Sequence, residues 1–315
     1  MSILIIQPVL HIISVLTGKN SADKGSNHMY FRTDLAIESH EISGCDSEGV
    51  GFESESRCGM KIHRLSIRTL SAQKRLGKPE GKYITISSLP LTDNFRDIKE
   101  QILIIADEIS ALIPQSGDAL IIGIGNTDIT SDSLGPFSAS SVIATRHIRG
   151  ELARSTGLSM LRPAAVISPG VLGKTGIETG EIVLSLIRSI SPTVVIAVDS
   201  LASKSVSHLG RTIQISDSGI APGSGIGNNR LALNKQSLGV PVIGIGIPTV
   251  VDAYTLVSDF CEDAPEKSFD SGRNLVVTPK EIDLLVERGS KLIGMAINCA
   301  LQKSYSFEDL AALIS

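Results

Sequence analysis

From residue 93 to residue 301 the chain alternates short apolar runs with helix-like stretches. The apolar runs have the length and composition of buried strands, and they lie at 119–125, 163–168, 193–199, 211–215 and 240–247. Helices are expected at 93–113, 136–147, 180–190 and 249–260. Repeated βα units favour parallel strands, because the crossover helices pack on both faces of the sheet. The chain is therefore predicted to have an α/β fold with a mainly parallel central sheet and helices on both faces.

The regions on either side of this alternation carry further local signals. Residues 61–67 and 82–86 alternate polar and apolar side chains, which predicts strands with one solvent-facing side. Thr278 and Glu281 form the pattern of a capping box, which predicts a helix from there to about Leu301. A chain of 315 residues that is 42% hydrophobic can bury a sizeable core. We therefore predict a single α/β domain over residues 35–315.

Residues 1–28 differ from the rest of the chain. An apolar stretch at 3–16 is interrupted by polar residues and a proline, and it is too short to span a bilayer as a helix. No Lys or Arg precedes it and no clean cleavage site of small residues follows, so a signal peptide is the less favoured alternative. A second methionine, Met29, stands before the motif-bearing region. We therefore expect residues 1–28 to be disordered or a mis-assigned leader, and we expect no membrane partner.

The composition argues against a nucleic-acid partner. The formal net charge is -4, the isoelectric point is about 5.9, and aromatic residues make up only 3% of the chain. Direct nucleic-acid binding usually needs a basic surface or stacking aromatic side chains. The cysteines form no CxxC motif and fit no zinc template; they are Cys45, Cys58, Cys261 and Cys299. Their pattern favours a reduced, cytoplasmic compartment.

Two acidic residues lie where an α/β enzyme places its chemistry. Asp132 belongs to the loop after the strand 119–125, and Asp199 is the last residue of the strand 193–199. Ligands gather outside the carboxyl ends of the strands in open α/β sheets, so both side chains are expected at the same edge. Two carboxylates can hydrolyse a peptide when one takes a proton from water and the other donates to the scissile carbonyl.

Other interpretations of the two aspartates stay open. Aspartates at strand ends are common caps and turn formers. Asp132, Asp199 and one histidine would also make a divalent-metal site. His147 is expected at the end of the helix 136–147, where a cation complements the helix dipole. Glycine-rich stretches at 123–126 and 169–176 lack the spacing of a dinucleotide or P-loop motif, so we expect no cofactor.

A series of short blocks runs in order from about Tyr30 to Leu301. The blocks lie at 32–36, 131–136, 145–147, 168–171, 176–179, 196–199, 213–217, 222–225 and 246–253. Together these blocks resemble the spore germination protease family of endospore-forming bacteria. So many blocks in one order are far more specific than any single glycine motif.

The resemblance implies an endopeptidase that initiates degradation of the small acid-soluble proteins that coat DNA in the dormant spore. Members of the family are made as inactive zymogens, remove an amino-terminal segment themselves and assemble as homotetramers. They are regarded as atypical aspartic proteases, and the two essential aspartates fall on Asp132 and Asp199. We therefore expect no metal at this site. The implied location is the cytoplasm of the forespore and the spore core. The family is similar in fold to hydrogenase maturation proteases, whose acidic residues at similar places bind a metal.

The resemblance also implies a processing site. Family substrates are cleaved after an acidic residue and before a hydrophobic residue that is followed by Ala. The matching residues here are Asp34, Leu35 and Ala36. Self-cleavage is therefore expected between Asp34 and Leu35, which makes residues 29–34 the end of a propeptide.

Recognition of an acidic residue before the cut would suit a basic or amide-rich pocket. Arg146 and Arg230 are candidates for such a pocket, and a surface ion pair is the alternative for each. Glu178, in the block 176–179, is a further candidate for substrate binding.

Two other functions stay open at this point. The first is a metal-dependent processing protease of the hydrogenase-maturation type, which would lose activity on chelation. The second is a non-enzymatic protein that binds spore proteins without cutting them. The leader 1–28 is not part of the family pattern, and the region 260–274 is shorter than in some relatives.

Overall fold

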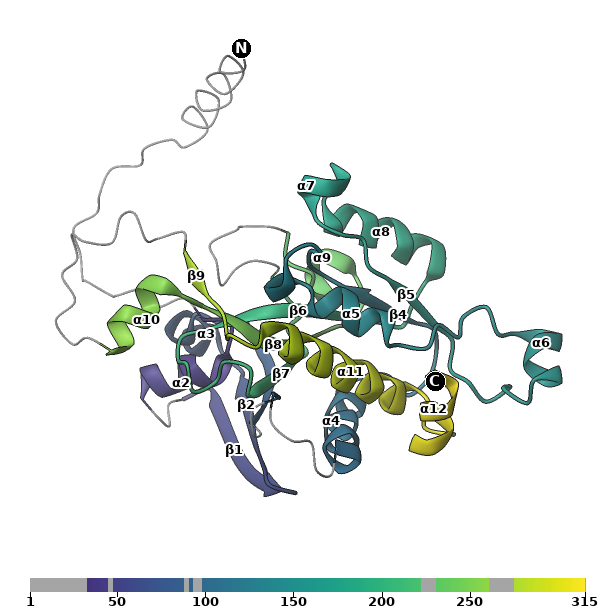
Figure 1. Ribbon diagram of the computed structural model, residues 1–315, viewed down its shortest axis with the longest axis horizontal. Coiled ribbons are helices and arrows are strands. Elements are labelled where there is room, and N and C mark those ends of the chain that lie inside the picture. The colour runs from purple at the N-terminus through teal and green to yellow at the C-terminus, as the bar shows by residue number, and fades with distance from the viewer. Residues whose placement is uncertain are drawn as a thin grey trace, which may run out of the picture. The chain divides into compact units, whose positions relative to one another are not determined.

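The computed structural model describes residues 33–44, 48–87, 91–92, 98–221, 231–260 and 275–314. They belong to one compact unit that spans Arg32–Ser315 (Figure 1). The expectations for residues 1–28, and most of those for 29–34, lie outside the described residues, as does Arg230. No helix among the described residues is long and apolar enough to cross a membrane.

The described strands form one nine-stranded sheet in the order β1-β2-β3-β7-β8-β6-β4-β5, with β9 paired to β8. Their bounds are β1 Val50–Arg57, β2 Met60–Ile67, β3 Gly81–Ser87, β4 Ala119–Gly123, β5 Ala164–Ile167, β6 Val194–Ser203, β7 Thr212–Ser216, β8 Val242–Asp252 and β9 Val276–Val277. The expected strands are all present, and β1 and β9 add to them.

The α/β class is confirmed, and the sheet is mixed. Strands β5, β4, β6 and β8 are parallel, and they make the half of the sheet that carries the two aspartates. Strands β1, β2, β3 and β7 pair in antiparallel fashion, and β7 joins this half to β8. The mainly parallel arrangement therefore holds only where helices connect the strands. The alternating residues of β2 and β3 instead pair in antiparallel fashion, which suits a sheet with one face partly exposed.

Helices cover both faces of the sheet. One face packs against α4 Ile98–Leu112, α5 Leu134–Ser140, α11 Ile282–Leu301 and α12 Phe307–Ile314. The buried residues of this face alternate along the strands, for example Ile196 and Val198 in β6, and they meet Ile105 and Ile109 of α4. A period of two on the strands and of 3.6 on the helices brings these apolar sides together.

The opposite face packs against α8 Thr179–Ile190 and α9 Lys235–Leu238. Here Val195 and Ala197 of β6 meet Val183 of α8. Near the antiparallel half, α2 Ala36–Ser43 and α3 Leu70–Leu76 pack on β2 and β3. The remaining helices are η1 Thr130–Asp132, α6 Gly150–Ser155, α7 Leu172–Thr175 and α10 Ala253–Phe260.

Two expected helix boundaries are wrong. Residues 136–147 form a helix only as far as Ser140, because the hydroxyls of Ser140 and Ser141 bond back to the carbonyl of Phe137 and end it. His147 therefore lies in a turn and not at a helix end. The capping box is also absent, since Thr278 donates its hydroxyl to the carbonyl of Thr249 at 2.9 Å and α11 begins later, at Ile282.

Two expected strand ends are also wrong. Strand β6 continues past Asp199 to Ser203, because β8 continues beside it to Asp252. The two strands stay paired through an irregularity between Leu201 and Ala202. The first residues of the helix expected at 249–260 belong to β8, so α10 begins at Ala253.

Candidate active site

Asp199 lies within β6 on the same face as α8 and α9, and only 5% of it is exposed. Its Oδ1 accepts a hydrogen bond from the backbone N–H of Ser200 at 2.8 Å. Asp199 pairs with Gly246 of β8, and Gly246 pairs with Gln214 of β7. Residues that pair in this way point to the same face of a sheet. Asp199 and Gln214 therefore stand on either side of a position that has no side chain.

Asp132 lies in η1, in the loop that follows β4, and is half-buried. Its carbonyl accepts the N–H of Asn126 at 2.9 Å, and its position leaves no room for a side chain at Gly125, whose φ is +129°. The hydroxyl of Thr249 in β8 donates to the carbonyl of Ser131 at 2.7 Å. These bonds fasten the loop to the end of the parallel strands.

The two aspartates share the carboxyl edge of the parallel strands, as expected. Strand β4 pairs with β6 as far as Gly123 and Val198, and the N–H of Ile124 then donates to the carbonyl of Val198 at 2.8 Å. Asp199 follows Val198 directly. The loop that carries Asp132 thus begins beside the backbone that carries Asp199.

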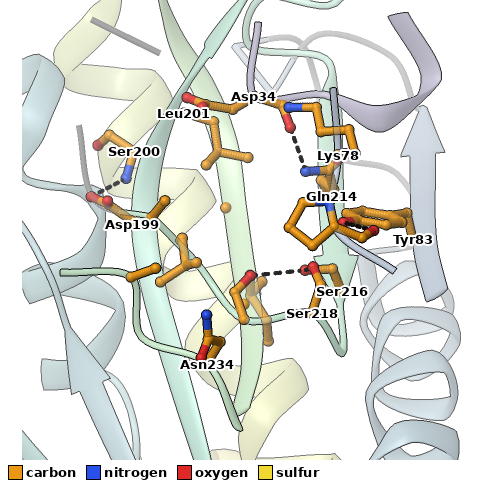
Figure 2. A pocket seen from close by; sticks show the side chains of 18 of the residues that line it. Asp34, Lys78, Tyr83, Asp199, Ser200, Leu201, Gln214, Ser216, Ser218 and Asn234 are labelled. Atoms are coloured by element: carbon orange, nitrogen blue, oxygen red, sulfur yellow. Dashed lines mark hydrogen bonds between the residues drawn. The ribbon is translucent and has the colours of Figure 1, made fainter. Parts of the chain in front are cut away.

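A pocket of about 220 Å³ opens beside Asp199. Gly244 and Gly246 of β8 lie on its lining together with Gln214, Ser216 and Tyr83, and Asp132 is not among the lining residues. Figure 2 shows Asp199 and Gln214 on opposite sides of this pocket. The glycines leave space over β8 that side chains would otherwise fill.

The expected processing site lies in this pocket. Asp34 lines it, and the backbone N–H of Asp34 donates to the carbonyl of Ala202 at 2.8 Å. The N–H of Ala202 donates in return to the Asp34 carboxylate at 2.8 Å. Ala202 lies in the part of β6 that extends beyond the end of β4, and both of its backbone groups bind Asp34.

The bond between Asp34 and Leu35 is bracketed by one side chain. Gln214 donates from Nε2 to the carbonyl of Asp34 at 2.8 Å (Figure 2). Its Oε1 accepts the N–H of Ala36 at 2.6 Å. Leu35 itself is fully buried and packs against Leu201, which lies two residues after Asp199 in β6. The residues expected on either side of the cut therefore have separate polar and apolar surroundings.

Lys78 lies beside the same segment and was not expected from the sequence. Its ammonium donates to the carbonyl of Thr33 at 2.8 Å. The residue as a whole is half-buried, but burial around the ammonium lowers the pKa of Lys78, and the carboxylates of Asp34 and Glu38 oppose that effect. On the same side of the pocket, burial raises the pKa of the Tyr83 phenol to about 12. The pocket therefore offers a cation and amide groups to an acidic segment.

The other residues expected in substrate binding lie elsewhere. Arg146 is 3.3 Å from the Asp118 carboxylate, which also binds Arg149, at the amino end of β4 and so at the opposite edge from Asp132. This position supports the ion-pair alternative for Arg146. Glu178 is the N-cap residue of α8 and does not line the pocket.

A metal site would need a histidine close to Asp132 and Asp199. Among the described residues, no group of three His, Cys, Asp or Glu side chains is placed to hold a metal ion. His147 is exposed and lies in the turn after Thr145, whose N–H bonds to the start of β5. The described histidines therefore do not complete a three-ligand cluster with the aspartates.

A comparison with known proteins defines the class of protein. A family model described as germination protease matches residues 29–263. Germination proteases of Caldanaerobacter subterraneus subsp. tengcongensis and Clostridium perfringens are each 38% identical to this chain; they cover 90% and 89% of it, and 98% and 97% of their own lengths are matched. That of Bacillus velezensis is 33% identical over 89% of this chain and 95% of its own.

These matches make the chain a peptidase of spore germination. It belongs to the germination protease family. Among solved structures, the NiFe hydrogenase maturation protease HycI from Thermococcus kodakarensis overlaps 60% of this chain and 98% of its own, at 18% identity and a TM-score of 0.35.

Proposed function

We propose that this peptidase works through Asp132 and Asp199, which activate a water molecule, and that its first substrate is its own bond between Asp34 and Leu35. The observation that carries the proposal is the position of that bond. Asp34 lines the pocket beside Asp199, and the backbone N–H and carbonyl of Asp34 are bound by Ala202 and Gln214. A substrate bound by the same contacts would present its scissile carbonyl to the carboxyl edge of the sheet.

In this mechanism the water oxygen bonds to the carbonyl carbon of Asp34 while a carboxylate takes one of its protons. The bond to the nitrogen of Leu35 then breaks, and that nitrogen receives a proton from the carboxylic acid. The products are a carboxyl group on Asp34 and a new amino terminus at Leu35. Leu35 directly precedes α2, so after the cut this helix begins one residue from the new amino terminus.

The segment that ends at Asp34 would also explain why the precursor is inactive. Asp34 occupies the pocket and both backbone groups of Ala202, which a second substrate would need. We propose that the chain is inactive toward other proteins until this segment leaves. We further propose that the mature enzyme acts as a homotetramer in the cytoplasm of the forespore and spore core. Its substrates would be small acid-soluble spore proteins, at sites with an acidic residue before a hydrophobic residue and Ala.

A digestion experiment tests this function. Mature protein beginning at Leu35 is incubated with a small acid-soluble spore protein, in parallel with the variants Asp132→Asn and Asp199→Asn. Asp107→Asn is the control, because the Asp107 carboxylate is 64% exposed and pairs with Arg57. The parent and the control should cut after acidic residues, and both active-site variants should leave the substrate intact. Cleavage by both variants, or activity that is lost on chelation and restored by added metal, would contradict the mechanism.

A further inference from the structure

The geometry points to Gln214 as a catalytic residue, and this inference rests on the function proposed above. We propose that its side-chain N–H stabilises the negative charge that develops on the scissile carbonyl oxygen during peptide hydrolysis. The oxygen in question is the carbonyl of Asp34, which receives the Nε2 hydrogen bond at 2.8 Å.

The orientation of the Gln214 amide is determined by its two partners. An amide oxygen cannot donate and an NH2 group cannot accept. Because Oε1 faces the N–H of Ala36 at 2.6 Å, Nε2 must face the carbonyl of Asp34. The bond to Ala36 therefore holds the donor in place before the reaction begins, and a pre-placed donor needs no reorganisation when charge appears.

The sheet places this donor opposite Asp199. Gln214, Gly246 and Asp199 are register partners on β7, β8 and β6. Two strand spacings of about 4.8 Å each separate the outer pair by roughly 10 Å of backbone. This width accommodates a peptide group and a water molecule between the two side chains. Water would approach the carbonyl carbon from the side of Asp199 while Gln214 binds the oxygen from the other side.

A hydrogen bond of this kind favours the reaction because it strengthens as the reaction proceeds. The ground-state carbonyl is neutral, whereas the oxygen carries negative charge once water has added to the carbon. Hydrogen bonds to charged acceptors are shorter and about twice as strong as those between neutral groups. Loss of one such donor lowers kcat by roughly 10²–10³-fold in well-studied hydrolases.

A pair of glutamine substitutions separates catalysis from stability. Gln214→Met keeps the length and neutrality of the side chain and removes the donor, and Gln214→Ala is the second variant. Gln302 is the matched control, since it is also buried and its side-chain amide also bonds to backbone on both sides. It accepts the N–H of Arg162 at 2.7 Å and donates to the carbonyl of Arg162 at 3.0 Å. It lies at the end of α11, remote from the pocket lining.

Two assays are run, each with a thermal unfolding scan to confirm that the variant is folded. The first follows the appearance of the Leu35 terminus in the full chain, and the second follows cleavage of a peptide with the sequence of residues 31–40 by the mature form. Gln214→Met should slow self-processing and lower kcat by about 10²-fold, with a smaller change in KM. Gln302→Met should keep kcat within about threefold of the parent even where it unfolds more easily.

A folded Gln214→Met or Gln214→Ala protein with kcat within about threefold of the parent would overturn the inference. Asp199→Asn, run in parallel, separates this failure from failure of the proposed function. If Asp199→Asn is inactive while the Gln214 variants are fully active, only the role of Gln214 is refuted. If Asp199→Asn processes at the parental rate, the aspartate mechanism is refuted, and the role of Gln214 opposite Asp199 with it.

Discussion

A methyl group at position 246 would test how the sheet keeps the active site open. A Cβ there would lie 2.5 Å from the carbonyl oxygen of Asp199 and 2.6 Å from Cγ of Leu201. Ordinary contacts are about 3.5 Å or longer, so β6 would have to move by roughly 1 Å beside Asp199. Overpacking of this kind costs about 1–3 kcal/mol of stability. A misplacement of about 1 Å at a catalytic group can cost about 10²-fold in rate.

We therefore expect Gly246→Ala to process the Asp34 to Leu35 bond about 10²-fold more slowly while losing only about 1–3 kcal/mol of unfolding free energy. The assay combines urea unfolding with amino-terminal sequencing over time. Gly173→Ala in α7 is the control, because nothing lies within 4 Å of a Cβ at that position. A Gly246→Ala protein that processes within twofold of the parent would refute the idea that this glycine keeps the site open.

Three further outcomes are expected. Leu35→Ala should destabilise the full chain by about 2–5 kcal/mol in urea unfolding, because Leu35 is fully buried; a change below about 0.5 kcal/mol would contradict its packing. The lowered pKa of Lys78 means that the unfolded chain binds more protons up to the ordinary pKa of 10.5, so stability should rise with pH in that window. Lys78→Met should flatten this rise, and an unchanged slope in unfolding at several pH values would argue against a buried ammonium. Arg146→Ala should cleave peptide within twofold of the parent, since Arg146 pairs with Asp118 at the opposite edge; a large rise in KM would restore it as a substrate-binding residue.

The strands of the parallel half could be predicted from continuous apolar runs in the sequence. The apolar runs of β4, β6 and β8 are buried on both faces, and each is long enough to read without tertiary information. The helices α4 and α8 could be placed because their apolar residues recur with the helical period of 3.6. Boundaries were less predictable, because partners decide them. Strand β6 continues past Asp199 only because β8 continues beside it. Thr278 does not cap α11, because its hydroxyl bonds to the carbonyl of Thr249 instead.

Part of the candidate site could be predicted and part could not. The rule for strand ends and the family pattern both pointed to Asp132 and Asp199, although β6 continues past Asp199 to Ser203. Asp34 and Leu35 came from the family pattern alone. The contact between Gln214 and Asp34 joins positions 180 residues apart, and no local pattern shows it. It depends on the order of β7, β8 and β6 in the sheet. Gln214 is the central residue of a strand that alternates polar and apolar side chains, a pattern that places it only on the side opposite Ile213 and Ile215.

Lys78 shows a different limit of sequence reasoning. It follows Gly77 at the end of α3, where a lysine is an ordinary surface residue. Only the packing of the segment at Thr33 against this turn brings its ammonium to a backbone carbonyl. Arg146 shows the reverse, since its block matches the family pattern but its side chain pairs with Asp118.

The most direct test of the account is the identity of the new amino terminus. Purified full-length protein is held at mildly acidic pH and followed by intact mass and amino-terminal sequencing, beside Asp132→Asn and Asp199→Asn. The account predicts one new terminus, at Leu35, in the parent and none in the two variants. A parent cut at another bond, or a Leu35 terminus that also appears in both variants, would contradict it.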